Sequence, residues 1–121
     1  MKKKKERKIL EVARALIAKP ENWIKYDYAC DQRGNVTATY DESSCKFCAQ
    51  GALLAAVPRA GYDRFSSRGA NLGFLLSDKI MKHVGTEWKS LPGWNDRPRT
   101  THADVIAAFD AAIEATRKKR V

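Results

Sequence analysis

Residues 43–58 read SSCKFCAQGALLAAVP, and this stretch decides the fold because it predicts a short helix with one side built entirely of small residues. Ser43 or Ser44 is a suitable N-cap, and Pro58 is expected to end the helix. A glycine inside a helix costs about 1 kcal/mol relative to alanine, so Gly51 indicates close contact with another backbone. We therefore expect this helix at the centre of the protein, with its small face turned inward. That face consists of Cys48, Gly51, Ala52 and Ala55.

Three longer stretches with apolar residues at helical spacing accompany this helix. The first spans residues 6–18 and is expected to stop at Lys19, because Pro20 disfavours helical geometry in the residue before it. The second spans residues 67–84, and the third begins after Thr101, which is a suitable N-cap. The sequence therefore predicts four helices.

Two segments between the predicted helices are expected to be non-helical. Residues 23–40 carry aromatic and β-branched residues on both sides of a turn at Gly34, which predicts a short β-hairpin. Residues 86–100 form the longest segment without periodicity, and Trp88 and Trp94 are expected to fold it back onto the core. The predicted fold class is mainly α: a compact four-helix single domain with a small β-hairpin and one long structured loop.

The chain of 121 residues is expected to form one domain, residues 8–116, between a flexible basic tail at residues 1–7 and a basic end at residues 117–121. No apolar run approaches the roughly 20 residues of a membrane-spanning helix, and no signal-peptide stretch follows the basic start. Three cysteines, an odd number, fit free thiols in a reducing compartment. We expect a cytoplasmic protein with no membrane contact and no cofactor.

Positive charge is concentrated at the two ends of the chain. The formal net charge is +9, and residues 2–8 and 117–120 hold ten of the 23 basic residues but only one of the 14 acidic residues. The remainder is balanced, with 13 residues of each sign. Basic ends attract polyanions through counterion release, although charged ends often serve only as solvated termini. The candidate binding residues here are Lys2, Lys3, Lys4, Lys5, Arg117, Lys118, Lys119 and Arg120.

The cysteines allow three interpretations. Zinc would take Cys30, Cys45 and Cys48 with a histidine, His83 or His102, but the second ligand pair of the usual pattern is missing, so no metal is expected. A thiol nucleophile would use Cys48 in the first turn of a helix, with His102 as base and Asp96 or Asn95 orienting it. The favoured interpretation is packing, because free cysteine behaves as a small hydrophobic residue.

Residues 94–96 read WND and form the third candidate site, which we call the WND motif. Asn95 and Asp96 can hydrogen-bond to nearby backbone and hold a loop in shape, with Trp94 packed beneath them. Alternatively, Trp94 and Asn95 are binding residues in a polar cluster at the mouth of a groove. Turn chemistry alone explains the motif, so we favour the structural interpretation.

Several motifs together resemble an uncharacterised family of small proteins from bacteria and their phages, a domain of unknown function. They are KPENW (19–23), YACDQRG (28–34), FCAQGAL (47–53), SLPGWND (90–96) and THADVIAAFDAAI (101–113). The resemblance spans residues 8–116, and the lysine-rich start lies beyond the family pattern. It implies no activity, cofactor or substrate, and a phage setting connects the chain with host-directed or anti-defence binding by association only.

These observations favour a non-enzymatic binding protein that engages a macromolecular partner, either nucleic acid or a host protein. The alternatives are a cysteine-dependent enzyme that uses Cys48 and His102, and a zinc-stabilised module. The oligomeric state and the identity of the partner stay open.

Overall fold

A computed structural model describes residues 3–63, 67–85 and 90–117. Within these ranges the chain is mainly helical with one small antiparallel strand pair, which confirms the predicted fold class. The helices are α1 (Lys3–Leu16), α2 (Ala49–Arg59), α3 (Ser67–Met81), α4 (Leu91–Asp96) and α5 (His102–Arg117), with a 3₁₀ helix, η1 (Pro20–Asn22); the strands are β1 (Ala29–Cys30) and β2 (Lys46–Phe47).

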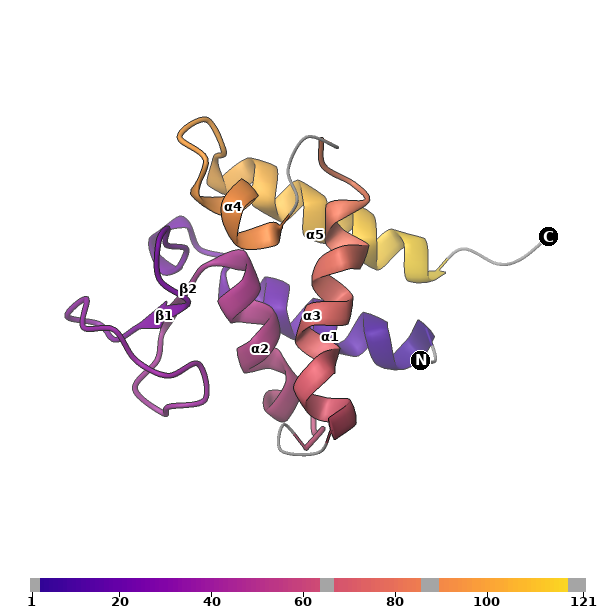
Figure 1. Ribbon diagram of the computed structural model, residues 1–121, viewed down its shortest axis with the longest axis horizontal. Helices are drawn as coiled ribbons and strands as arrows, with labels where there is room; N and C mark the ends of the chain where they lie inside the picture. The colour runs from indigo at the N-terminus through magenta and orange to yellow at the C-terminus, as the bar shows by residue number, and fades with distance from the viewer. Residues whose placement is uncertain (1–2, 64–66, 86–89, 118–121) are drawn as a thin grey trace.

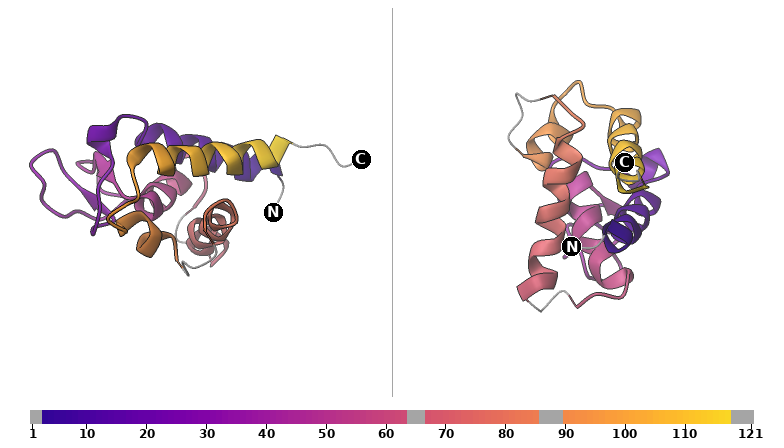
Figure 2. Two further views of the ribbon diagram at one scale, coloured as in Figure 1. Left: turned by 90° about the horizontal axis from the view of Figure 1, so that it is seen from above. Right: turned by 90° about the vertical axis from the view of Figure 1, so that its right-hand side faces the viewer.

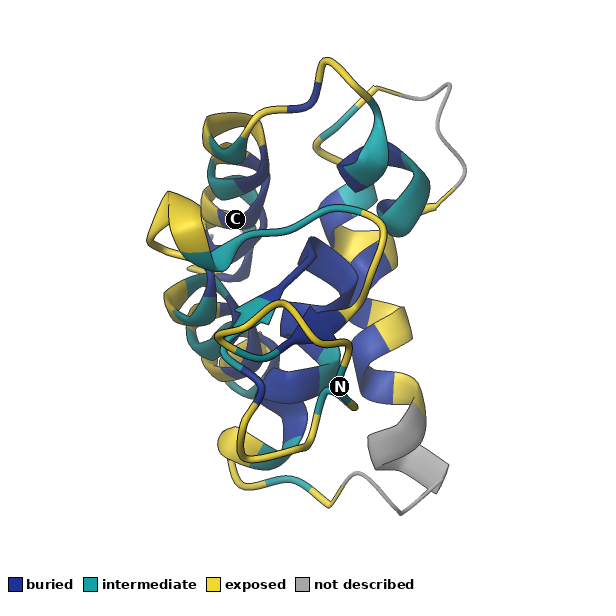
Figure 3. Cartoon of the chain, turned by 90° about the vertical axis from the view of Figure 1, so that its left-hand side faces the viewer, coloured by how far each residue is buried: buried dark blue, intermediate teal, exposed yellow. Residues whose placement is uncertain are grey.

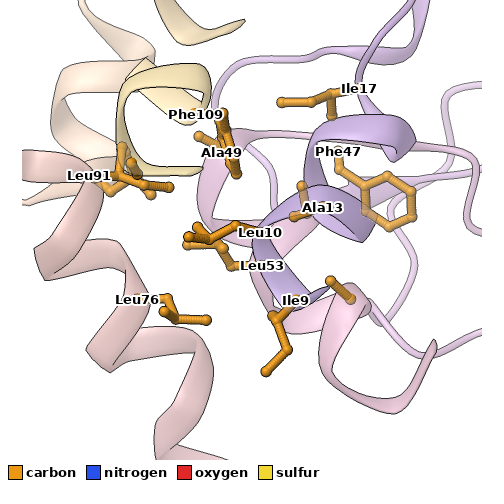
Figure 4. Packing of buried hydrophobic residues seen from close by; sticks show 14 of the residues in the cluster. Ile9, Leu10, Ala13, Ile17, Phe47, Ala49, Leu53, Leu76, Leu91 and Phe109 are labelled. Carbon is orange, nitrogen blue, oxygen red and sulfur yellow. The ribbon is translucent and has the colours of Figure 1, made fainter. Parts of the chain in front are cut away.

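Helix α2 lies at the centre of the helical body, as its small residues predict. It packs between α1 and α3, while α5 lies alongside α1 and crosses the end of α3 (Figures 1 and 2). Almost the whole of α2 is buried, as the dark blue ribbon in Figure 3 shows. Leu53 of α2, Leu10 of α1 and Phe109 of α5 meet in a common hydrophobic core (Figure 4).

Gly51 makes the close backbone contact that the sequence predicts, but its partner is a loop rather than a second helix. A Cβ atom at this position would lie 1.8 Å from the carbonyl oxygen of Tyr28. The Cys48 amide also donates a hydrogen bond to that oxygen, at 3.3 Å. The segment before β1 is thereby held directly against the start of α2.

The start of α2 differs from the prediction. Cys48 is the N-cap, and its sulfur accepts a hydrogen bond from the Gly51 amide at 3.3 Å. Neither Ser43 nor Ser44 can cap the helix, because residues 46–47 are extended and pair with β1. Pro58 lies inside the last turn, and the helix ends one residue later.

The strand pair is also formed differently from the predicted hairpin. β1 pairs with β2, so that Ala29 faces Phe47 and Cys30 faces Lys46. Residues 36–40 form no strand; they contribute an isolated bridge between Cys30 and Val36 and a hydrogen bond from the Thr37 amide to the Ala29 carbonyl at 3.1 Å. The predicted turn at Gly34 is present, since this residue has a φ of 89°.

Residues 86–100 contain a helix that the sequence analysis did not predict. α4 begins after Ser90, whose hydroxyl accepts a hydrogen bond from the Gly93 amide at 3.2 Å. Trp94 is buried against the core, as expected, whereas Trp88 lies outside the described residues. The described chain therefore has five α-helices rather than four.

Residues 3–5, which were expected to precede the first helix, belong to α1. The Arg7 guanidinium donates hydrogen bonds to the Thr116 hydroxyl at 3.0 Å and to the Thr116 carbonyl at 3.1 Å. The Glu6 carboxylate lies 3.6 Å from the Lys79 ammonium. These contacts join residues that are 73 or more positions apart in the sequence, so local sequence patterns could not predict them. Lys2 and residues 118–121 lie outside the described residues.

Candidate functional site

The side chain of Asn95 is the centre of the polar site. It is completely buried, at 0% exposure. Its Oδ1 atom accepts hydrogen bonds from Trp23 Nε1 at 2.7 Å and from the Ala49 amide at 2.9 Å. Its Nδ2 atom donates to the Ile24 carbonyl at 3.1 Å and to the Asp96 carboxylate at 3.0 Å. All four hydrogen-bonding positions of the amide are therefore occupied.

Asp96 continues this network to the loop of residues 23–28, which is half-buried at residues 23–25 and exposed at residues 26–28 and which we call the tyrosine loop. Its Oδ1 atom accepts a hydrogen bond from the Tyr26 amide at 2.8 Å. Tyr26 has a φ of 77°, a left-handed conformation that is a genuine outlier for a bulky residue. The Lys25 ammonium donates to the Arg97 carbonyl at 2.6 Å and ties the loop to the end of α4 a second time. The WND motif thus fixes the backbone that displays Tyr26.

His102 supports the other side of the same loop. Its Nε2 atom lies 2.7 Å from the carbonyl oxygen of Ile17, at the end of α1. Its ring centroid lies 6.1 Å from that of Trp23, with the two planes tilted by 54°. These contacts join the start of α5, the end of α1 and the tyrosine loop.

Cys48 is sealed in the core rather than paired with an imidazole. The residue is 2% exposed, and burial raises the pKa of its thiol to about 11. The hydrogen bond from the Gly51 amide opposes this pKa rise, and the negative charge of Asp96 adds to it. The His102 ring points to the Ile17 carbonyl, so the structure does not join Cys48 and His102 by a hydrogen bond. A thiol nucleophile requires the opposite pKa shift.

The remaining cysteines lie beside the strand pair. The Cys45 amide donates to the Cys30 carbonyl at 3.0 Å, and the Cys45 sulfur lies 3.4 Å from Gln32 Oε1. Among the described residues, no group of three or more histidine, cysteine or acidic side chains is placed to hold a metal ion. Nor does the described part of the chain contain a helix long and apolar enough to span a membrane.

The structure brings together some of the predicted site residues and separates others. Asn95 and Asp96 lie in one network, and Trp94 is buried in the hydrophobic core. Cys48 lies next to this network, because the Ala49 amide that follows it is bonded to Asn95. The basic residues lie elsewhere, at the beginning of α1 and the end of α5: Lys3, Lys4, Lys5 and Arg117.

Sequence reasoning missed Trp23, Lys25 and Tyr26 as members of the site. Their hydrogen-bond partners lie 70 residues or more further along the chain, so spacing alone could not reveal them. The sequence contained only an indirect indication of these site residues, because Trp23, Tyr26 and Tyr28 lie in a segment without apolar periodicity.

The sequence model of a family of unknown function (DUF6197) matches residues 1–115, and the chain belongs to this family. The match includes the lysine-rich start, which the resemblance had left outside the family pattern. Comparisons with curated proteins and with solved structures find no match.

Proposed function

We propose that this protein is a non-enzymatic binding protein that engages a partner protein through the tyrosine loop. The observation that carries the proposal is the conformation of Tyr26. Its side chain is 76% exposed, while its backbone is held in a left-handed conformation by the Asp96 carboxylate. Such a conformation costs on the order of 1–3 kcal/mol and tends to occur where function requires it.

The exposed side chains of this region suit a protein interface. Tyr28 and Tyr40 are also exposed, and tyrosine is enriched at binding hot spots because it offers a large rigid surface and a polar hydroxyl. Segment 23–47 projects from the helical body on the left of Figure 1, and its loops are largely exposed in Figure 3.

The charge of this segment favours protein over nucleic acid. Its basic residues are Lys25, Arg33 and Lys46, and its acidic residues are Asp27, Asp31, Asp41 and Glu42. A nucleic-acid surface needs an excess of positive charge, because affinity comes mainly from phosphate neutralisation. A nearly balanced surface rich in tyrosine is typical of a protein interface.

The enzymatic alternative is less well supported by the site. Thiol catalysis needs an accessible thiolate, whereas Cys48 is buried with a raised pKa and has no imidazole bonded to it. We further propose a cytoplasmic setting in bacteria or phage-infected cells. The family resemblance and three cysteines outside any disulfide support this setting.

Site-specific photo-crosslinking tests the protein-binding proposal. A photoreactive phenylalanine analogue replaces Tyr26, and the matched control carries it at Ala107, an exposed position on α5. After irradiation in cells of the source organism, we expect one discrete protein adduct from position 26 that is absent from position 107. The adduct should be lost when Asp96→Ala is added, because this change frees the loop. Adducts to nucleic acid, or identical patterns from both positions, would contradict the proposal.

A further inference from the structure

A cavity of about 260 Å³ lies at the opposite end of the molecule from the tyrosine loop. It opens between the beginning of α1, the end of α3 with the turn that follows it, and the C-terminal half of α5. The lining includes three lysines, one histidine and one glutamate: Lys3, Lys79, Lys82, His83 and Glu6. None of these residues takes part in the site around Asn95.

The charges of this cavity are not balanced. Glu6 is 7% exposed and pairs with Lys79 across 3.6 Å, so one lysine is compensated. Within residues 3–63, 67–85 and 90–117, neither Lys3 nor Lys82 has an ion-pair partner. Lys3, at the beginning of α1, and Lys82, in the turn after α3, therefore line the same space without an ion-pair partner of their own among the described residues, and His83 adds further donor capacity.

The walls that carry these lysines are fixed relative to each other. Arg7 joins the beginning of α1 to Thr116 of α5 through two hydrogen bonds. The pair between Glu6 and Lys79 joins the beginning of α1 to α3. The helices thus hold the cavity open without the two unpaired lysines, which leaves those lysines available for a ligand.

We propose that this cavity binds a phosphate group, carried either by a nucleic-acid backbone or by a small phosphorylated molecule. Lysine is a flexible point charge that commonly binds phosphate, and two unpaired lysines can contact different oxygens of one group. The cavity volume of about 260 Å³ leaves room for a phosphate group beside these lysines. The proposal does not depend on the tyrosine loop, because the two sites share no residues.

The test measures the binding of two probes, inorganic pyrophosphate and a fluorescently labelled single-stranded DNA of twelve nucleotides. Pyrophosphate is titrated by calorimetry, and the DNA by fluorescence anisotropy at fixed salt. The pocket variant carries Lys3→Gln and Lys82→Gln. The control variant carries Lys19→Gln and Arg33→Gln, two exposed residues away from the cavity, so that both variants lose the same net charge.

We expect the pocket variant to bind at least one probe about tenfold more weakly than the parent protein, because a charge-assisted contact is removed at each lysine. The control variant should bind within about twofold of the parent, a small general-charge effect. Lys82→Arg should retain binding, because it keeps the charge. The melting temperatures of the two double variants are also compared. If they are equal, weaker binding by the pocket variant does not result from unfolding.

The two probes separate the two sources of phosphate. Weakened pyrophosphate binding alone assigns the site to small phosphorylated molecules, and weakened DNA binding alone assigns it to a nucleic-acid backbone. Weakening of both supports a phosphate site that accepts either source. If neither probe binds the parent protein, or if both double variants weaken binding equally, the proposal is overturned.

Discussion

Replacement of Asn95 by alanine should cause one of the largest losses of stability available in this chain. The change removes four hydrogen bonds and leaves the Trp23 indole N–H, the Ala49 amide and the Ile24 carbonyl without their partner. A buried polar group without a partner costs about 1–3 kcal/mol. Because Trp23 is half-buried and can recruit water, we expect the free energy of unfolding to fall by about 4 kcal/mol.

Urea denaturation followed by far-ultraviolet circular dichroism measures this loss. For an m-value of about 1.5 kcal/mol/M, the midpoint should fall by about 2–3 M urea. The control is Asn22→Ala, at a half-buried position in η1, which should change the free energy of unfolding by less than about 0.5 kcal/mol. Trp23→Phe removes only one of the four bonds and should cost about 1 kcal/mol.

The outcome that would refute this reasoning is a loss below about 1 kcal/mol for Asn95→Ala. It would mean that water or neighbouring groups satisfy the partners of Asn95 as well as the amide does. A loss of similar size in Asn22→Ala would also refute it, since the effect would then not arise from the network.

The further predictions concern Gly51, Cys48 and Tyr26. Gly51→Ala should lower the free energy of unfolding by at least about 3 kcal/mol in urea titrations, because the alanine Cβ would lie 1.8 Å from a backbone oxygen. An unchanged urea midpoint would contradict this prediction. Iodoacetamide should modify Cys48 of the native protein more slowly than Cys45 at pH 8, as measured by peptide mapping with mass spectrometry. Rapid modification of Cys48 would instead support the cysteine-dependent enzyme. The raised pKa of Cys48 also means that its contribution to stability is present below pH 9.0 and is lost as the pH rises toward about 11. Tyr26→Gly should raise the free energy of unfolding by about 1 kcal/mol, because glycine relieves the left-handed strain, whereas Tyr28→Gly should lower it. If both variants or neither of them were more stable than the parent protein, the backbone of Tyr26 would not be strained.

Helical periodicity predicted the core of the fold because packing depends on local spacing. The small face of α2 is buried at the centre, and α1 and α5 lie close to where their apolar residues predict. The errors occurred where long-range contacts override local signals. α4 is only six residues long and carries Pro92 and Gly93, so periodicity could not detect it. α1 begins before the predicted start because its first turns pack against α5 and α3.

The pairing of β1 with β2 also depends on contacts that local sequence does not reveal. The turn at Gly34 was predictable, because glycine and its neighbours have strong turn chemistry. The register was not predictable, because β1 and β2 are two residues each and pair across a 15-residue connection. In strands this short, packing against α2 determines which strands pair, because two residues cannot show an alternation of apolar and polar side chains.

The sequence singled out Asn95 and Asp96 of the candidate site, but neither the loop residues that they hold nor the arrangement of the site. The WND motif was recognised as turn chemistry, and the structure extends this to a network that reaches the tyrosine loop. The sequence could not show that Cys48 and His102 point to different partners, because residue types alone do not fix side-chain direction. Burial of Cys48, in contrast, followed directly from its place on the small face.

Amide hydrogen exchange of Tyr26 tests most directly whether the WND motif holds the tyrosine loop. The Tyr26 amide is bonded to the Asp96 carboxylate at 2.8 Å, although the loop is exposed. In the parent protein we predict slow exchange at this amide, which should become at least about tenfold faster in Asp96→Ala. The Gly34 amide, which is bonded to the backbone of Asp31, should exchange equally in both proteins. Unprotected exchange at Tyr26 in the parent protein, or equal protection in the variant, would contradict the account.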